Sequence, residues 1–267
     1  MTSEKTHDLE ELSQFAQQAV QRIGGEALAF YGRGGGADDK FNQRLVTEAE
    51  LHLMDMFETL LSASYPDQQL FRDNQVKKAY SHEENRYLWI FDPIDGVDNF
   101  QAGIPIWGMS LALLENFWPI LGLFYIPVTN DLFHARAEGR AFWGEESISV
   151  TRRDSIDDES LLLTFSRFHQ HYQCRFPGKI RNLGCTAAHI CYVAKGRADA
   201  ALIANESYRD LAAVRVIIEA AGGKICTLDG RQFFLNEFLN GERIKEHLLV
   251  VSPAIRQQVI AQLGRAA

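Results

Sequence analysis

The sequence predicts an α/β protein, with an α+β first half (residues 1–150) and an α/β second half (residues 151–267). Three observations predict it. Apolar residues recur at helical spacing near the N-terminus, strand-like apolar runs follow residue 87, and strand-like and helical segments alternate after residue 160. With 267 residues, of which 46% are hydrophobic, the chain is long enough to bury a large core.

Two helices are expected before residue 66. In residues 8–31 the apolar side chains lie mostly three or four positions apart, although Gly24 and Gly25 weaken the middle of the segment. A second helix is expected to follow Thr47, because apolar residues again recur on one face there. Pro66 cannot continue a helix, so it marks the end of that segment.

The next elements are predicted to be strands. An apolar run at 87–91 is followed by three runs, at 107–114, 119–125 and 132–137, which are typical of an antiparallel meander. Residues 151–159 are charged and lack periodicity, so we expect the boundary between the halves there. Beyond it we expect strands at 160–166, 198–203, 223–227 and 247–251, and helices near 185–195, 210–221 and 253–263.

Composition excludes several classes of protein. The net charge is −8 and there is no basic run, which argues against nucleic acid as a partner. No apolar stretch approaches the roughly 18–20 residues that span a bilayer, and the N-terminus is polar rather than signal-like. The four cysteines show no CxxC spacing and have apolar neighbours, so we expect buried free thiols. A cytoplasmic protein without a membrane partner is therefore predicted.

The most informative segment is the turn that begins at Asp92 and ends at Gly96. It follows the apolar run 87–91, and Pro93 cannot donate to a sheet ladder. Asp92 and Asp95 can therefore converge at the end of a strand, where like charges repel unless a cation neutralises them. Oxygen ligands without His or Cys favour Mg²⁺ over zinc. From the residues alone, a solvated turn whose aspartates cap the next segment is an equally valid interpretation.

The same turn carries a family resemblance. Asp92 to Gly96, with Asn99 and Phe100 after them, resembles the DPxDGTxNF signature of the inositol monophosphatase family. The resemblance runs from about residue 10 to 262 in the family's order and spacing, and it implies a layered α/β/α/β/α sandwich, an active site between the halves, and a homodimer. Further matches are Leu45-Val46-Thr47, Gly103-Ile104-Pro105, Leu183-Gly184, Gly196-Arg197, Asp210–Ala213 and Ala221–Gly223.

The resemblance also implies a reaction and the residues that perform it. The expected reaction is Mg²⁺-dependent hydrolysis of a small phosphate monoester, in which a metal-activated water attacks the phosphate. From the residues alone, Asp210 is also explained as a cap or first-turn residue of its helix, and the two roles are compatible. The implied metal ligands are Asp73, Asp92, Asp95, Asp210 and the carbonyl of Ile94. The implied substrate-binding residues are Gly96, Val97 and Asp210, and the implied catalytic residues are Glu50, Asp92 and Asp95.

Four positions depart from the family's pattern. Val97 stands where the family has a threonine that helps to activate water, and Glu50 stands where it has the aspartate that partners this threonine. Thr47 to Glu50 also fits a capping box, so Glu50 is equally explained by the start of its helix. Asp73 is one methylene shorter than the family's glutamate. Ile203 replaces a substrate-binding glutamate, and it cannot accept a hydrogen bond from a sugar or inositol hydroxyl.

Two functions from different classes therefore stay open. The first is a phosphatase whose substrate need not be an inositol phosphate. The second is a catalytically impaired member that binds a metal or a phosphorylated ligand in a regulatory or scaffolding role, since loss of a positioned general base costs about 10²–10⁴-fold in rate. A relic without metal is disfavoured, because only Arg72 or Arg209 would neutralise Asp92 and Asp95. Asp98 is either a new base or metal ligand, or an exposed turn residue.

Overall fold

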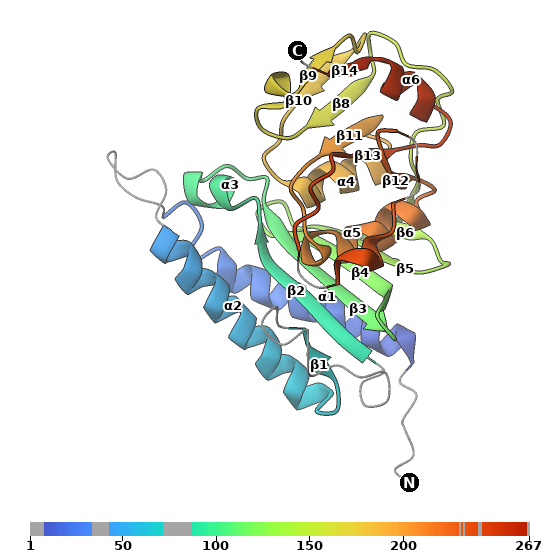
Figure 1. The fold of residues 1–267 in the computed structure, drawn as a ribbon. Helices are drawn as coiled ribbons and strands as arrows, with labels where there is room; N and C mark the ends of the chain where they lie inside the picture. Colours follow the sequence, from blue (N-terminus) through green and yellow to red (C-terminus); the bar gives the residue numbers. More distant parts are fainter. Residues whose placement is uncertain are drawn as a thin grey trace.

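Helices and sheets alternate in five layers (Figure 1). Helices α1 (Leu9–Ala27) and α2 (Gln43–Ser64) cover one face of a seven-stranded sheet. Helices α4 (Thr186–Ala194) and α5 (Tyr208–Ala220) lie between this sheet and a five-stranded sheet, whose far face packs against α6 (Arg256–Ala261). This computed structural model describes residues 8–33, 43–71, 87–229, 231, 233–239 and 242–265. The α/β class and the layered sandwich expected from the sequence are confirmed.

The seven-stranded sheet follows the chain order, and the meander predicted for its middle strands is present. Its strands pair antiparallel, except that the first pair, β1 and β2, is parallel. They are β1 (Gln69–Leu70), β2 (Tyr87–Asp95), β3 (Gly108–Glu115), β4 (Trp118–Ile126), β5 (Asp131–Arg136), β6 (Ala141–Trp143) and β7 (Glu146–Ile148).

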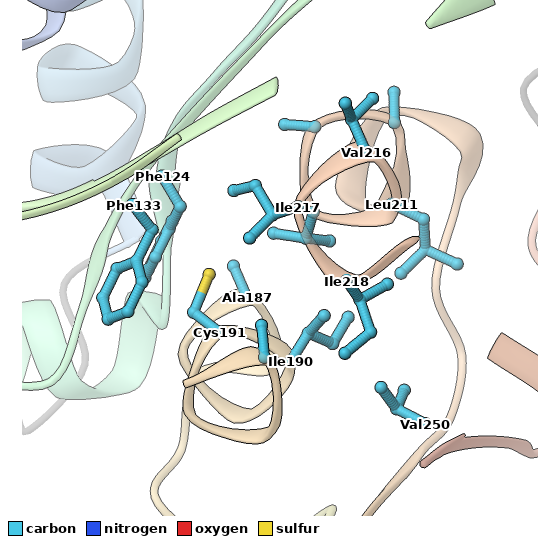
Figure 2. Close-up of a cluster of buried hydrophobic side chains, with 14 of the residues drawn as sticks. Phe124, Phe133, Ala187, Ile190, Cys191, Leu211, Val216, Ile217, Ile218 and Val250 are labelled. Carbon is cyan, nitrogen blue, oxygen red and sulfur yellow. The ribbon is translucent and has the colours of Figure 1, made fainter. Parts of the chain in front are cut away.

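The first part of strand β2, residues 87–91, is apolar because both faces of the strand are buried. Trp89 and Phe91 pack with α1 and α2, whereas Leu88 and Ile90 belong to the cluster formed with α4 and α5. Strands covered on both faces read as continuous apolar runs rather than as alternating ones. Figure 2 shows the second cluster, in which Phe124 and Phe133 of the first sheet face the side chains of α4 and α5. The core is thus continuous between the two halves.

The five-stranded sheet presents one edge to the first half. Its order is β10-β8-β11-β13-β12, in which β10, β8 and β11 run parallel and β13 is antiparallel to both of its neighbours. The carboxyl ends of β8, β10 and β11 therefore meet the start of β13 at the same edge. The strands are β8 (Leu161–Thr164), β10 (Lys179–Arg181), β11 (Ala200–Ile203), β12 (Lys224–Thr227) and β13 (Leu248–Val251).

Smaller elements complete the fold. A two-stranded sheet joins β9 (Tyr172–Cys174) to β14 (Leu263–Arg265), and two 3₁₀ turns, η2 (Phe168–Gln170) and η3 (Leu235–Phe238), lie in the connections. A six-residue helix, α3 (Val97–Ala102), follows β2 directly. None of the described helices is both long and apolar enough to cross a membrane.

The predicted start of the second helix was wrong. Residue Thr47 lies inside α2, and its hydroxyl donates to the carbonyl of Gln43 at 3.0 Å, so it is not a cap. The capping-box interpretation of Glu50 therefore fails. Helix α1 runs through Gly24 without a break. The ring of Tyr125 packs against Gly24 and leaves no room there for a side chain, which explains the glycine at this position.

Candidate active site

One cavity of about 400 Å³ collects most of the residues that the sequence singled out. The end of β2, the start of α3, one face of α2 and the loops at the edge of the second sheet form its walls. Asp98 also reaches the cavity but is exposed. Asp73 and Arg72 lie outside the described residues. The predicted residues that line the cavity are Glu50, Asp92, Ile94, Asp95, Gly96, Val97 and Asp210.

The turn after β2 is shaped by its proline and its glycine. Pairing between β2 and β3 loses its regular register between Asp92 and Asp95, as expected where Pro93 donates no hydrogen bond. Gly96 adopts a left-handed conformation (φ 87°), and a Cβ there would lie 3.0 Å from the Cβ of Cys185. A glycine is needed because the turn packs directly against the second half.

Asp95 is held by the start of α4. Its carboxylate accepts hydrogen bonds from the backbone N–H of Ala187 at 2.5 Å and from the thiol of Cys185 at 3.4 Å. Burial raises the pKa of Asp95, and these donors oppose that rise because they stabilise the charged form. The thiol pKa of Cys185 is raised well above its ordinary value by burial and by Asp95, so Cys185 acts as a donor.

Asp92 is paired with an arginine from the second half. Its side chain is nearly buried, and Nη2 of Arg209 lies 3.2 Å from Oδ1. The pKa of Asp92 is raised to about 7: burial is the largest cause, Arg209 opposes the rise, and Asp210, Asp95 and Glu50 add to it. Four carboxylates therefore repel one another across this cavity, and a cation between them would relieve that repulsion.

Asp210 belongs to the first turn of α5, and the N-cap is Ser207. The two residues form a capping box: the Ser207 N–H donates to Oδ2 of Asp210 at 2.8 Å, and the Asp210 N–H donates to the Ser207 hydroxyl. The same Oδ2 also accepts from Nη1 of Arg243 at 3.1 Å. The helix start thus fixes this carboxylate at the cavity wall, facing the β2 turn.

Glu206 is a cavity residue that sequence reasoning missed. It is 8% exposed, its Oε1 accepts from the hydroxyl of Thr186 at 2.9 Å, and burial raises its pKa well above the ordinary value. Ile203 lies inside β11 and does not line the cavity. Ile203 cannot accept a hydrogen bond from a ligand, but the carboxyl group of Glu206, three residues later, can. The Ser-x-x-Asp cap that follows Glu206 is the only sequence signal near it.

The donor set suits Mg²⁺ in its chemistry. Asp92, Asp95, Asp210 and the carbonyl of Ile94 offer only oxygen atoms, which are the ligands that Mg²⁺ prefers. Within the described ranges, no three His, Cys, Asp or Glu side chains are grouped closely enough to hold a metal ion as they stand. Two of the three aspartates instead face arginines, Arg209 and Arg243, which supply positive charge from the chain itself.

Comparison with known proteins agrees with the fold. The inositol monophosphatase family model matches residues 8–262. A fructose-1,6-bisphosphatase/inositol-1-monophosphatase of Thermotoga maritima is 26% identical over 245 residues, which is 86% of this chain and 93% of that protein. A histidinol-phosphatase of Chlorobaculum parvum is 28% identical over 260 residues, which is 94% of this chain and 96% of that protein. The solved structure of a Thermotoga maritima IMPase shares the fold, with a TM-score of 0.76 at 24% identity, over 95% of this chain and 96% of that one.

Proposed function

Because the chain belongs to the inositol monophosphatase family, we propose that it is a Mg²⁺-dependent phosphatase that hydrolyses a small phosphate monoester. One observation carries this proposal: carboxylates from both halves line the same cavity. Asp92 and Asp95 come from the end of β2, and Asp210 comes from the start of α5. The relatives named above bear the names of phosphatases that act on different phosphate esters, so the family alone does not choose the substrate.

The proposed metal ligands are Asp92, Asp95, Asp210 and the carbonyl of Ile94, with Asp73 as a further ligand from outside the described residues. Bound Mg²⁺ would supply Lewis-acid polarisation of the phosphoryl group and of water. Asp95 stays oriented for this role because Ala187 and Cys185 hold it from the other half.

Two further groups of the chain are proposed to handle the substrate and the proton. The backbone N–H groups of Gly96 and Val97 lie at the turn that follows Asp95, where they donate to phosphate oxygens. Glu50 accepts the proton of the attacking water. Its pKa is raised by burial, although Arg209 counteracts that rise, so Glu50 is a stronger base than an exposed glutamate.

A catalytically impaired, ligand-binding role is the second candidate, and one observation favours it. Two of the expected metal ligands, Asp92 and Asp210, form ion pairs with Arg209 and Arg243, so their negative charge is partly neutralised by the chain itself. Val97 also removes the hydroxyl through which the base would act. In this candidate the cavity binds a phosphorylated ligand without turnover.

Phosphate release from a panel of monoesters, with and without millimolar Mg²⁺, distinguishes the two candidates. The panel contains inositol monophosphates, sugar phosphates and nucleoside monophosphates, and Asp95→Asn serves as the site variant. Metal-dependent turnover that the variant loses supports the phosphatase. A folded wild-type protein that binds the esters and releases no phosphate from any of them supports the second candidate.

We also propose that the protein works in the cytoplasm as a homodimer. All four cysteines are free thiols and three of them are buried, which suits a reducing compartment. Trp118 is 54% exposed on the meander, where a second copy would cover it. Sedimentation of wild type and Trp118→Lys tests the dimer: the wild type should sediment as a dimer and the variant as a monomer, whereas a monomeric wild type would refute it.

A further inference from the structure

A second cavity, of about 490 Å³, adjoins the carboxylate cavity. Both are lined by Gly184, Thr186, Ala204, Asn205 and Glu206, so the two cavities border one another along these five residues. The second cavity lies at the edge of the five-stranded sheet where β8, β10 and β11 end and β13 begins. A phosphate held at the β2 turn would therefore direct the rest of its ester past Thr186 and Glu206 into this space.

Three aromatic rings form the far wall of this second cavity. Phe165 follows β8, His171 ends the η2 turn, and His247 precedes β13. The centroid of the His247 ring lies 4.7 Å from that of Phe165 and 5.1 Å from that of His171. The hydroxyl of Tyr172 lies 2.7 Å from Nδ1 of His247, which fixes the orientation of that ring. We call this space the ring cavity.

The other polar groups that line the ring cavity are the amides of Gln170, Asn182 and Asn205, the guanidinium of Arg167, the hydroxyls of Ser166 and Thr186, the imidazole of His189 and the carboxyl group of Glu206. Asn182 is fixed, because its Nδ2 donates to the hydroxyl of Ser166 at 3.0 Å and its Oδ1 accepts from the Gly184 N–H at 2.8 Å. Gln170 and Arg167 reach the cavity from the exposed η2 turn. Such groups pair with the nitrogen atoms at the edge of a heterocycle, while the ring wall contacts its face.

A polyol fits this wall poorly. Its hydroxyls project around the whole ring and each needs a hydrogen-bond partner, whereas Phe165 offers none. A planar ring, in contrast, stacks on aromatic side chains, and it keeps its polar edge free to pair with Asn182 or Gln170.

We propose that the ring cavity receives the leaving group of the substrate, and that this group carries a planar nitrogen heterocycle. The proposal rests on the proposed phosphatase function, because it assigns the cavity to the part of the ester that departs. The proposal narrows the substrate from any small phosphate monoester to one whose alcohol carries a planar nitrogen heterocycle.

The turnover test compares adenosine 5′-monophosphate with ribose 5-phosphate, two esters that differ chiefly by the base. With Mg²⁺ present, we expect kcat/KM to be about tenfold or more higher for the nucleotide, the effect of stacking one base. Phe165→Ala and Phe165→Leu should remove most of this preference, and the leucine variant keeps the apolar volume if the alanine variant folds poorly. Phe142→Ala is the matched control, since Phe142 is a half-buried ring that stacks on His134 away from both cavities.

A binding test separates failure of this inference from failure of the proposed function. Calorimetry in the presence of Mg²⁺ should show adenosine, the alcohol released from the nucleotide, binding several-fold more tightly than ribose, with the difference lost in Phe165→Leu. Robust turnover with equal kcat/KM for the two esters, or equal losses for both in the Phe165 variants, would overturn the inference and leave the phosphatase proposal intact. Binding with the aromatic preference but no turnover of any ester would support the ring cavity and refute the phosphatase.

Discussion

Arg209 places its guanidinium Nη2 3.2 Å from Oδ1 of Asp92, a nearly buried aspartate that is one of the proposed metal ligands. The arginine comes from the first turn of α5, immediately before Asp210, so two neighbouring residues bring opposite charges to the same cavity. A cation from the chain therefore stands where Mg²⁺ would bind, and the two cations compete for one carboxylate.

Removal of this competitor should strengthen metal binding. We expect Arg209→Met to bind Mg²⁺ about tenfold more tightly than wild type. In wild type, Mg²⁺ binding must first break the Arg209–Asp92 ion pair, which costs about 1.4 kcal/mol, and the variant lacks this pair. Arg215→Met is the matched control, since Arg215 lies on the same helix and pairs with Glu219, away from the cavity. Calorimetric titration with Mg²⁺ measures both variants, and equal affinities in all three proteins would contradict the competition.

Restoring the family's hydroxyl and its partner should raise activity. Val97 and Glu50 line the same cavity, and Val97→Thr changes shape little while it adds a proton relay. We expect Val97→Thr combined with Glu50→Asp to increase kcat by about 10–100-fold. Val97→Ala is the control for altered volume. If kcat of the double variant does not exceed that of wild type, Val97 is not what limits the rate.

Gly96 should be intolerant of a side chain for two separate reasons, its left-handed backbone and its contact with Cys185 and Gly184. Gly144 shares the positive φ but has open space around it, so Gly144→Ala measures backbone strain alone. We expect Gly144→Ala to lower the free energy of unfolding by about 1 kcal/mol and Gly96→Ala by about 2–4 kcal/mol. Urea denaturation compares the two, and equal losses would show that the contact contributes nothing.

His189 should make stability depend on acidity. It is buried, its Nε2 accepts from the Leu183 N–H at 2.9 Å, and burial lowers its pKa from 6.5 to about 4. Between these values the unfolded chain binds more protons than the folded one, so the free energy of unfolding falls as the pH drops from about 6.5 to about 4. The full effect is about 3 kcal/mol.

His189→Asn keeps an acceptor at that position but does not titrate, so it should flatten this part of the pH profile. His169→Asn replaces an exposed histidine and should leave the profile unchanged. Urea denaturation at a series of pH values gives the comparison. Parallel profiles for wild type and His189→Asn would contradict the assignment.

The β2 turn could be predicted from the sequence because its signals are local. A continuous apolar run, a proline that interrupts pairing and a glycine that permits φ above zero all lie within ten residues, and the structure places Asp92, Asp95 and Gly96 at one cavity. The start of α2 could not be located in the same way. A threonine can cap a helix, but it can also lie inside one and donate its hydroxyl to the carbonyl four residues earlier, as Thr47 does. The residue type alone therefore did not locate the start of α2.

Glu206 and Arg243 were missed because no local pattern marks them as cavity residues; the Ser-x-x-Asp cap after Glu206 indicates only the start of a helix. Both come from loops at the edge of the second sheet, and their proximity to the β2 turn depends on how β11 and β13 pair and where those strands begin and end. The ring cavity has the same origin, since Phe165, His171 and His247 are distant in sequence and meet only at that edge. Pairing between distant strands is what a single sequence specifies least directly.

The central claim is that Asp95 and Asp210, from different halves of the chain, hold the same Mg²⁺. Calorimetric titration of wild type, Asp95→Asn and Asp210→Asn with Mg²⁺ tests it most directly. The account predicts a binding isotherm for wild type that both variants lose, although each substitution changes only one half of the protein. Absence of Mg²⁺ binding by folded wild type, or binding by Asp210→Asn with wild-type affinity, would contradict it.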